Sequence, residues 1–400
     1  MSRLEFVALI AMMFATIAFS IDAMLPALPE IAAELSPEEP NRASLILTSF
    51  VLGMGVGTFI AGPLSDAYGR RRVMFCGAVL YVVAAAVAWA SSSLEVMLVA
   101  RIFQGLGAAA PRIVSVAVVR DLYAGREMAK ITSIVMMIFT LVPAIAPLVG
   151  SIIIAGFGWR GIFVAFVIFI TIGMIWMGAR LPETLAVENR RPLRLPLMAA
   201  AIREIFSHPS VRISILVQSL AMAMLFSMLM LIQPIYYEVY DRAESFPYWF
   251  GAVAIFAGSA SLLNAVLVVR FGMRTLVTVT LAVQIVLSAL MLIFDLGAMA
   301  EPYGFAAFVL FQTCLFFQAG LTLGNLNAIA MEPMGHIAGI AASVVAALST
   351  VLAAAIASPV GLMFNGTITP LVLAILIMAA MGLAMMLYIA RIERRLAVAE

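Results

Sequence analysis

The chain is 400 residues long, with a formal net charge of +2, 64% hydrophobic residues and only 11% charged residues. A soluble globular protein carries about 25% charged residues, so this composition excludes a water-soluble fold and indicates a protein that crosses the membrane several times. The small net charge speaks against nucleic acid as a partner, and the two cysteines and two histidines stand too far apart for a disulfide framework or a metal site, so no cofactor is expected.

Twelve apolar segments are long enough to cross a bilayer as helices, which takes about 20 residues each. The first, 4–28, contains Asp22 and is interpreted as a span rather than a signal peptide, because its apolar run is long and no cleavage pattern follows it. The fourth, 96–118, contains Arg101 and Arg112. The remaining spans are predicted at 43–65, 73–94, 131–159, 161–179, 213–237, 245–269, 275–294 and 302–331, with two more in 333–390 on either side of the turn at 364–367.

The basic residues outside the spans are distributed unequally between the two sides of the membrane. If the N-terminus is cytoplasmic, the inside segments hold 18 of them and the outside segments hold three, at Arg42, Arg160 and Arg242. Cytoplasmic loops carry the excess of arginine and lysine in membrane proteins. Both termini are therefore predicted to be cytoplasmic.

The longest polar connection, roughly 181–209, separates spans six and seven. Its proline- and arginine-rich sequence indicates a cytoplasmic linker with a short surface helix around Ala199–Phe206. Residues 1–180 and 210–400 are therefore expected to form an N-terminal and a C-terminal six-helix bundle. Two weak internal echoes support a duplication: Asp66–Arg71 with Val269–Arg274, and Ile102–Gly105 with Phe316–Ala319.

The turn after the second span reads GPLSDAYGRRR, residues 62–72. Gly62 and Gly69 permit a tight reversal and a close approach of helices. Asp66 is placed to meet a helix N-terminus or an arginine, whereas Arg70 and Arg71 suit helix C-termini and lipid head groups. On these properties alone the stretch is most simply an ordinary basic turn.

Together with three further stretches, this turn resembles the signature of the major facilitator superfamily. Arg101-x-x-Gln104-Gly105-x-Gly107 is similar to the span-four motif of its proton-coupled members. Asp22-x-x-x-Pro26 is similar to the span-one motif of its drug exporters. Ala146-Pro147-Leu148-Val149-Gly150 is similar to the span-five motif of its antiporters. With MEPMGHIAG at 331–339, the mixture is most similar to the Bcr/CflA branch of drug:proton antiporters.

The resemblance implies an all-α fold of twelve transmembrane helices in two pseudo-symmetric six-helix bundles around a central cavity. It also implies that one set of motif residues serves the conformational change: Gly62, Asp66, Gly69, Arg70, Arg71, Pro143, Pro147 and Gly150. Pro143 stands near where the span-five motif often has glycine, so helix packing there is expected to differ.

Two charged residues fall at similar depths in the spans that the resemblance places on the cavity. Asp22 lies about 12 Å inside the outer end of span one, counted from Glu30. Arg101 lies about 9 Å inside span four, counted from Glu95. Charges at membrane depth are costly, and each lowers the cost of the other when they pair. We expect Asp22 and Arg101 to couple protons to transport, with a purely structural ion pair as the alternative.

Arg112 follows Arg101 by eleven residues, which returns to within about 20° of the same helix face some 16 Å farther along. Either it joins Arg101 in a stripe that attracts electron-rich or anionic groups, or it extends to the cytoplasmic surface. Most other polar residues in the spans are expected to bond between helices. The expected substrate contacts are Phe19, Asp22, Arg101, Gln104, Arg112, Gln233 and Asn325.

The sequence is therefore interpreted as a secondary transporter of a bacterial inner membrane that exports hydrophobic drugs, and so confers antibiotic resistance, in exchange for protons. Its partners would be a small hydrophobic substrate, protons and lipid, and it is expected to act as a monomer. The sequence lacks the GxxxxGK[ST] motif of an ATP-driven pump, and it lacks the nucleophile–base or metal constellation of an enzyme. Two alternatives stay open: an exporter of a dedicated metabolite or organic anion, and a membrane sensor or assembly factor without transport.

Overall fold

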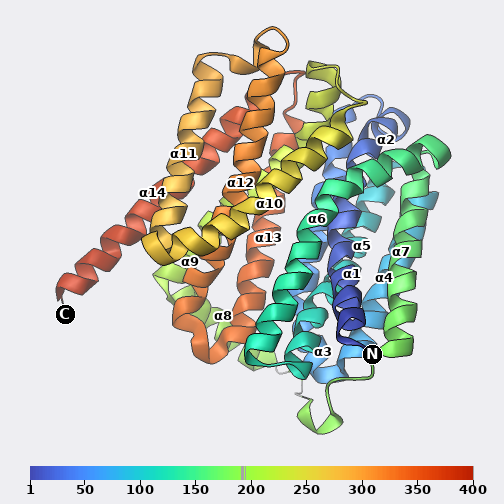
Figure 1. Ribbon diagram of the computed structural model, residues 1–400, viewed down its shortest axis with the longest axis vertical. Coiled ribbons are helices and arrows are strands. Elements are labelled where there is room, and N and C mark those ends of the chain that lie inside the picture. Colours follow the sequence, from blue (N-terminus) through green and yellow to red (C-terminus); the bar gives the residue numbers. More distant parts are fainter. Residues whose placement is uncertain (191–192, 194, 400) are drawn as a thin grey trace. The chain divides into compact units, whose positions relative to one another are not determined.

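The computed structural model describes residues 1–190, 193 and 195–399, and in these ranges it contains helices and turns but no strand. The chain forms two compact units, Met1–Arg194 and Leu195–Glu400, called unit 1 and unit 2 below. Part of the predicted linker, at 191, 192 and 194, lies outside the described residues. Figure 1 shows that each unit is made up of helices.

Unit 1 is built from seven α-helices and short helical turns. Its elements are α1 Arg3–Asp22, η1 Leu25–Ala27, α2 Leu28–Leu35, η2 Pro40–Ser44, α3 Leu45–Tyr68, α4 Arg70–Ala90, α5 Leu94–Leu122, α6 Gly125–Phe157, α7 Arg160–Arg180 and η3 Val187–Asn189.

Unit 2 has the same kind of construction. Its elements are α8 Leu195–Ser207, α9 Pro209–Pro234, η4 Ile235–Val239, α10 Phe246–Phe271, α11 Met273–Ile293, η5 Leu296–Ala298, α12 Tyr303–Met331, η6 Glu332–Ile337, α13 Ala338–Leu362 and α14 Thr369–Ala399. The helix expected around Ala199–Phe206 is the short α8, which is not long enough to span a membrane.

The described residues contain eleven continuous helical segments that are long and apolar enough to cross a membrane. One of them, Tyr303–Leu362, has 60 residues and consists of α12 and α13 joined by η6, so that it supplies two crossings. The prediction of an all-α protein with twelve spans is therefore confirmed. The ends of the observed spans differ from the predicted ranges mainly in span one, where helical structure continues through α2 to Leu35.

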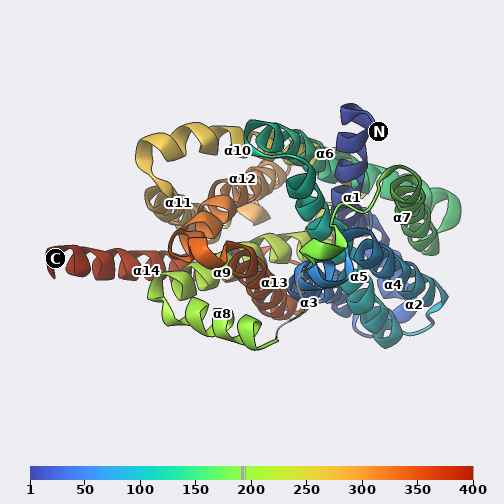
Figure 2. The same cartoon turned by 90° about the horizontal axis from the view of Figure 1, so that it is seen from below.

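Unit 1 owes its closest packing to glycines between α3, α4 and α5. Figure 2 shows α1, α3 and α4 around α5. A Cβ atom at Gly53 of α3 would collide with the carbonyl oxygen of Ile102, and one at Gly105 of α5 would collide with the carbonyl oxygen of Phe50. Because neither position can hold a side chain, the backbones of α3 and α5 approach closely, as small residues allow in membrane bundles.

We expect Gly105→Ala to destabilise the protein by about 1–3 kcal/mol, because the added methyl group has no space beside Phe50. The matched control is Gly156→Ala, since a Cβ at Gly156 meets no atom within 4 Å. The control is expected to keep or slightly raise the stability, because alanine is the better helix former. Thermal unfolding of the two purified variants measures the difference, and equal unfolding temperatures would contradict this packing.

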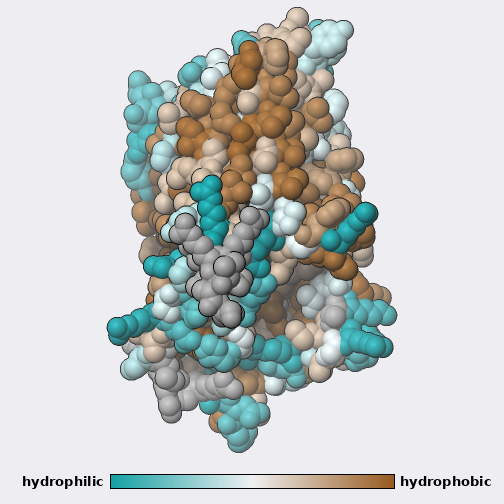
Figure 3. Space-filling model, turned by 90° about the vertical axis from the view of Figure 1, so that its left-hand side faces the viewer, coloured by the Kyte–Doolittle hydropathy of each residue, from teal (hydrophilic) through white to brown (hydrophobic). Residues whose placement is uncertain are grey.

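Large apolar side chains cover the outward faces of both units. On α7 they include Ile168, Ile172 and Ile175, which are 54%, 53% and 67% exposed, and on α10 they include Val266 and Val269. Their spacing of three or four residues forms a stripe along each helix. Figure 3 shows a broad hydrophobic area on one face, with hydrophilic side chains gathered at its lower edge. Lipid chains are the natural neighbours of such a surface.

An exposed ion pair joins two loops of unit 2 at the end where α9 stops. The guanidinium of Arg242 donates to Glu301 at 2.6 Å. This hydrogen bond holds the pKa of the Glu301 carboxyl below its ordinary value. The pair is accessible to solvent, so its contribution to stability is small.

Candidate functional site

The first membrane-crossing helix breaks directly after Asp22. α1 ends at this residue and the short η1, which contains Pro26, follows after a two-residue turn. Proline has no N–H to donate to the carbonyl of Asp22, so the regular helix cannot continue. The side chain of Asp22 is only 5% exposed. The one carboxylate at depth in this span is therefore buried at a helix break.

A glycine of α6 packs against the same break. A Cβ atom at Gly150 would collide with the carbonyl oxygen of Ala23, the residue next to Asp22. Pro143 and Pro147 lie inside α6 before this contact, and Ser151 donates to the carbonyl of Pro147 at 3.0 Å. The antiporter-like motif of span five is thus in direct contact with the turn that follows Asp22.

Arg101 of α5 is fully buried and holds three helices together. Its guanidinium donates to the carbonyl oxygen of Ser20 on α1 at 2.9 Å and to the carbonyl oxygen of Ile46 on α3 at 3.3 Å. It also donates to the side chain of Gln104 at 2.8 Å, and its charged group stands 4.4 Å from the ring centre of Phe50. Its exposed fraction is 0%. The arginine therefore fixes α1 two residues before Asp22.

The direct pairing of Asp22 with Arg101 is not formed in this structure. The hydrogen bonds of Arg101 go to Ser20, Ile46 and Gln104, and among the described residues Asp22 makes neither a hydrogen bond nor an ion pair. The two groups are linked through the backbone between Ser20 and Asp22. Arg101 thus holds the end of α1 that carries Asp22 without contacting the carboxylate.

Two hydroxyl groups near this link, those of Ser20 and Tyr81, are not among the site residues expected from the sequence. The Tyr81 hydroxyl of α4 hydrogen-bonds to the Ser20 hydroxyl at 2.6 Å, and Ser20 donates to the carbonyl of Thr16 at 2.6 Å. Tyr81 is 1% exposed. A signal was present, because Tyr81 is the one hydroxyl-bearing residue of α4. A tyrosine in the middle of an apolar span needs a polar partner when it is buried.

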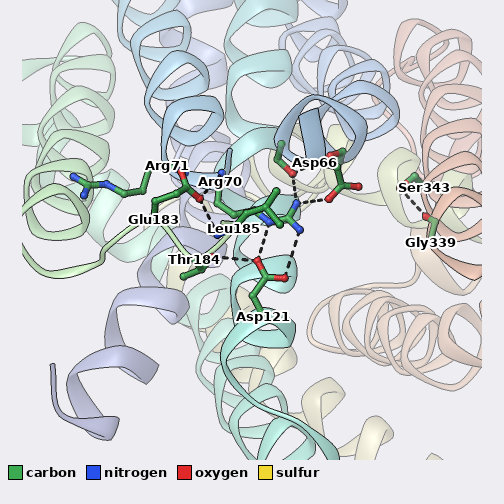
Figure 4. A network of polar contacts seen from close by, with 11 residues as sticks. Asp66, Arg70, Arg71, Asp121, Glu183, Thr184, Leu185, Gly339 and Ser343 are labelled. Atoms are coloured by element: carbon green, nitrogen blue, oxygen red, sulfur yellow. Dashed lines mark hydrogen bonds and ion pairs between the residues drawn. The ribbon is translucent and has the colours of Figure 1, made fainter. Parts of the chain in front are cut away.

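The basic turn between α3 and α4 forms a network of charges, shown in Figure 4. Arg70 is 3% exposed and donates to Asp66 at 2.5 Å, to Asp121 at 2.9 Å and to the Ser65 hydroxyl at 2.7 Å. Asp121 lies at the end of α5 and also accepts from Thr184 at 3.1 Å. Asp121 is not among the residues expected from the sequence, because nothing in the sequence places the end of α5 beside this turn.

Glu183, which follows α7, caps the N-terminus of α4. Its carboxylate accepts from the backbone N–H of Arg70 at 2.8 Å and of Arg71 at 3.1 Å, both visible in Figure 4. Gly69 has φ +99°, and a Cβ there would stand 2.8 Å from the Glu183 carboxylate. The guanidinium of Arg71 donates to the carbonyl of Gly178 at 2.8 Å, near the C-terminus of α7. Carboxylates at N-termini and cations at C-termini are the favourable arrangement of helix ends.

The other expected substrate contacts lie in different surroundings. Phe19 packs against the rings of Phe166 and Phe169. Asn325 of α12 donates to Asn264 of α10 at 2.7 Å, so in this structure it joins two helices of unit 2. Gln233 is 6% exposed, and its side-chain oxygen has no partner among the described residues.

Three other expected residues, Gly62, Gln104 and Arg112, differ in how they are bonded. Gly62 lies in α3 directly before Pro63, and its carbonyl accepts from the Ser65 hydroxyl at 2.8 Å. The Nε2 atom of Gln104 has no partner within the described ranges. Arg112 is half-buried, and the described residues offer it neither a hydrogen bond nor an ion pair.

No group of three His, Cys, Asp or Glu side chains in the described parts could hold a metal ion.

The chain is similar in sequence and in fold to known membrane transporters. The family model described as Major Facilitator Superfamily matches residues 8–358. A bicyclomycin resistance protein homolog of Haemophilus influenzae is 29% identical over 360 residues, which cover 88% of each chain. A chloramphenicol resistance protein of Pseudomonas aeruginosa is 39% identical over 156 residues, covering 39% of this chain and 36% of its own. Among solved structures, a peptide transporter described as POT aligns with a TM-score of 0.76 at 13% identity, covering 97% and 94% of the two chains.

Proposed function

Since the chain belongs to the Major Facilitator Superfamily, whose members are transporters and not enzymes, we propose that it exports hydrophobic drugs or xenobiotics in exchange for protons across a bacterial inner membrane, as a monomer. The observation that carries the proposal is the buried Asp22 at the break of α1. An ionisable group at membrane depth is expensive and is usually retained for transport. The resistance proteins among its relatives support drugs as the substrate class.

In the proposed cycle, Asp22 takes up a proton from the outside and releases it when substrate enters from the cytoplasm. Arg101 holds α1 in place through the Ser20 carbonyl, so that the carboxylate keeps its position while its charge changes. The two six-helix bundles rock about a central site, as secondary transporters with repeated halves do. The charges around Arg70 and the contact of Gly150 with Ala23 would respond to that movement.

A drug-susceptibility panel tests this function. The gene is expressed in a bacterial host stripped of its own exporters, and the purified protein is placed in vesicles with a pH-sensitive dye. We expect resistance to several unrelated hydrophobic drugs, together with drug-dependent proton movement. Resistance to a single compound would favour the exporter of a dedicated metabolite or organic anion. No proton flux and no resistance would favour a sensor or assembly factor.

We also propose that both termini face the cytoplasm, because the basic residues are concentrated on that side. Single cysteines near Arg71 and Glu188 should react only with a reagent supplied from the cytoplasm, and one near Glu39 only with a reagent supplied from outside. The background should have Cys76 and Cys314 replaced by serine, since Cys76 is exposed. Labelling of position 188 from outside would contradict the orientation.

A further inference from the structure

One charged side chain of unit 1, Arg112, has no part in the proton coupling proposed above. It stands on α5 eleven residues after Arg101 and eleven residues before Tyr123. A step of eleven residues turns a helix by only about 20° beyond three full turns, so Arg101 and Arg112 share one face, and Tyr123 follows where the helix ends. This face is the one that α1 covers at both ends. Arg101 donates to Ser20 at one end, and the rings of Tyr123 and Phe6 stand 5.3 Å apart at the other.

Arg112 therefore lies at membrane depth on α5, midway between these two contacts with α1. Arg120, an exposed arginine at the end of α5, is about 12 Å farther along the helix axis. That distance is more than an arginine side chain can bridge, which disfavours extension of Arg112 to the surface. No carboxylate of the described residues pairs with Arg112. An arginine without a counter-ion at this depth is a costly arrangement, and a ligand can relieve the cost.

A second polar group on α5 also lacks a partner. The Ser115 side chain, one turn from Arg112, is 0% exposed, and its hydroxyl oxygen makes no hydrogen bond with any described residue. Ser151 and Ser219 donate to the carbonyl four residues before them, as serines in membrane helices usually do. Residues three apart are neighbours on a helix, so Ser115 and Arg112 can act on the same group.

We infer that Arg112 and Ser115 form a subsite for an anionic group of the substrate, such as a carboxylate or a sulfonate. The inference rests on the proposed transport function and narrows its substrate class. A guanidinium presents several N–H donors in a plane that fits a carboxylate, and the hydroxyl adds one more donor. The same charge repels a cation. The favoured substrates are therefore hydrophobic compounds that carry one negative group.

The charge balance of transport follows from this subsite. Export of a monovalent anion against one imported proton moves the equivalent of two positive charges inward in each cycle. Export of a monovalent cation against one proton would move none. An anionic substrate therefore makes transport respond strongly to the membrane potential.

The experiment uses two hydrophobic ions of nearly the same size and shape, tetraphenylborate and tetraphenylphosphonium, which bear opposite charges. Their binding to the detergent-purified full-length protein is followed by tryptophan fluorescence, with partition into micelles measured separately. We expect Arg112→Gln to weaken the binding of tetraphenylborate by about tenfold or more, since the attraction between the guanidinium and the negative ion is lost, and not to weaken the binding of tetraphenylphosphonium. Arg112→Lys should keep part of the affinity, because it keeps the positive charge. Ser115→Ala should weaken the binding of naphthalenesulfonate but not of tetraphenylborate, because only the sulfonate has oxygens that accept a hydrogen bond.

The matched control is Arg120→Gln, which removes an exposed arginine from the same helix and should leave both affinities unchanged. Unchanged tetraphenylborate binding in a folded Arg112→Gln variant would overturn the subsite. If that variant does not fold, a displacement measurement on the wild-type protein tests the subsite instead. Displacement of bound tetraphenylborate by naphthalenesulfonate but not by naphthylmethylammonium supports the subsite, and equal displacement refutes it. Anion binding without proton release would contradict the antiport and leave the subsite in place.

Discussion

Replacing Asp22 with asparagine is expected to abolish substrate-induced proton release while the protein still folds and inserts. Asp22 is buried and makes no hydrogen bond or ion pair with any described residue, so an amide of the same shape breaks no contact. The amide cannot exchange a proton at any working pH. Release should therefore fall from about one proton per protein molecule to none, because one carboxylate carries one proton.

The measurement is the pH change of a weakly buffered solution of the detergent-purified protein when a saturating drug is added. Glu30→Gln is the matched control, because Glu30 is an exposed carboxylate of the adjoining helix α2, and its loss should leave release unchanged. Full release from the Asp22 variant would show that another group carries the proton. Asp22 would then be a structural residue of the helix break.

Replacing Arg101 with glutamine is expected to have the largest effect on stability in unit 1. The side chain is fully buried, and its removal deprives the carbonyl oxygens of Ser20 and Ile46 of their donor. Each hydrogen bond from a charged group contributes about 1.5–3 kcal/mol, so we expect a loss of about 3 kcal/mol or more. Export should be lost as well, since the end of α1 that carries Asp22 is no longer held in place by Arg101.

Arg101→Lys separates charge from geometry. Lysine keeps the positive charge, but its single ammonium nitrogen cannot reach the acceptors that three different guanidinium nitrogens bond, so the stability of this variant should lie between those of the wild type and Arg101→Gln. Arg120→Gln provides the exposed reference on the same helix. Thermal unfolding in detergent measures all three variants. An Arg101→Gln protein that unfolds at the wild-type temperature would show that the three hydrogen bonds contribute little.

The helices could be predicted because their signal is local. The length of each apolar run defines a span, and the turn at 364–367 separates α13 from α14 where the sequence indicated it. The end of α1 at Asp22 follows from Pro26, four residues later, because proline removes the N–H that the helix needs. The short helix α8 was indicated by the composition of the linker.

The contacts between helices could not be predicted from the sequence in the same way. The partners of Arg101 on α1 and α3 are backbone carbonyls, and every residue has one, so no residue type marks them. Asp121 and Glu183 converge on the turn at Arg70 from the ends of two other helices, which only the folded chain brings together. The pairing of Asn325 with Asn264 depends likewise on how α10 and α12 pack.

The contact between α6 and the turn after Asp22 works as a mechanical linkage. Pro143 and Pro147 each remove a backbone hydrogen bond, so α6 can flex there at a lower cost than a regular helix. Gly150 transmits the flexing, because its backbone touches the carbonyl of Ala23 with no side chain between them to absorb displacement. The Gly150 backbone thus presses on the peptide unit between Ala23 and Met24, directly after Asp22. A change in the curvature of one helix would thereby shift Asp22, the proposed proton carrier, and tie the mechanics of the bundle to its chemistry without any intervening charge.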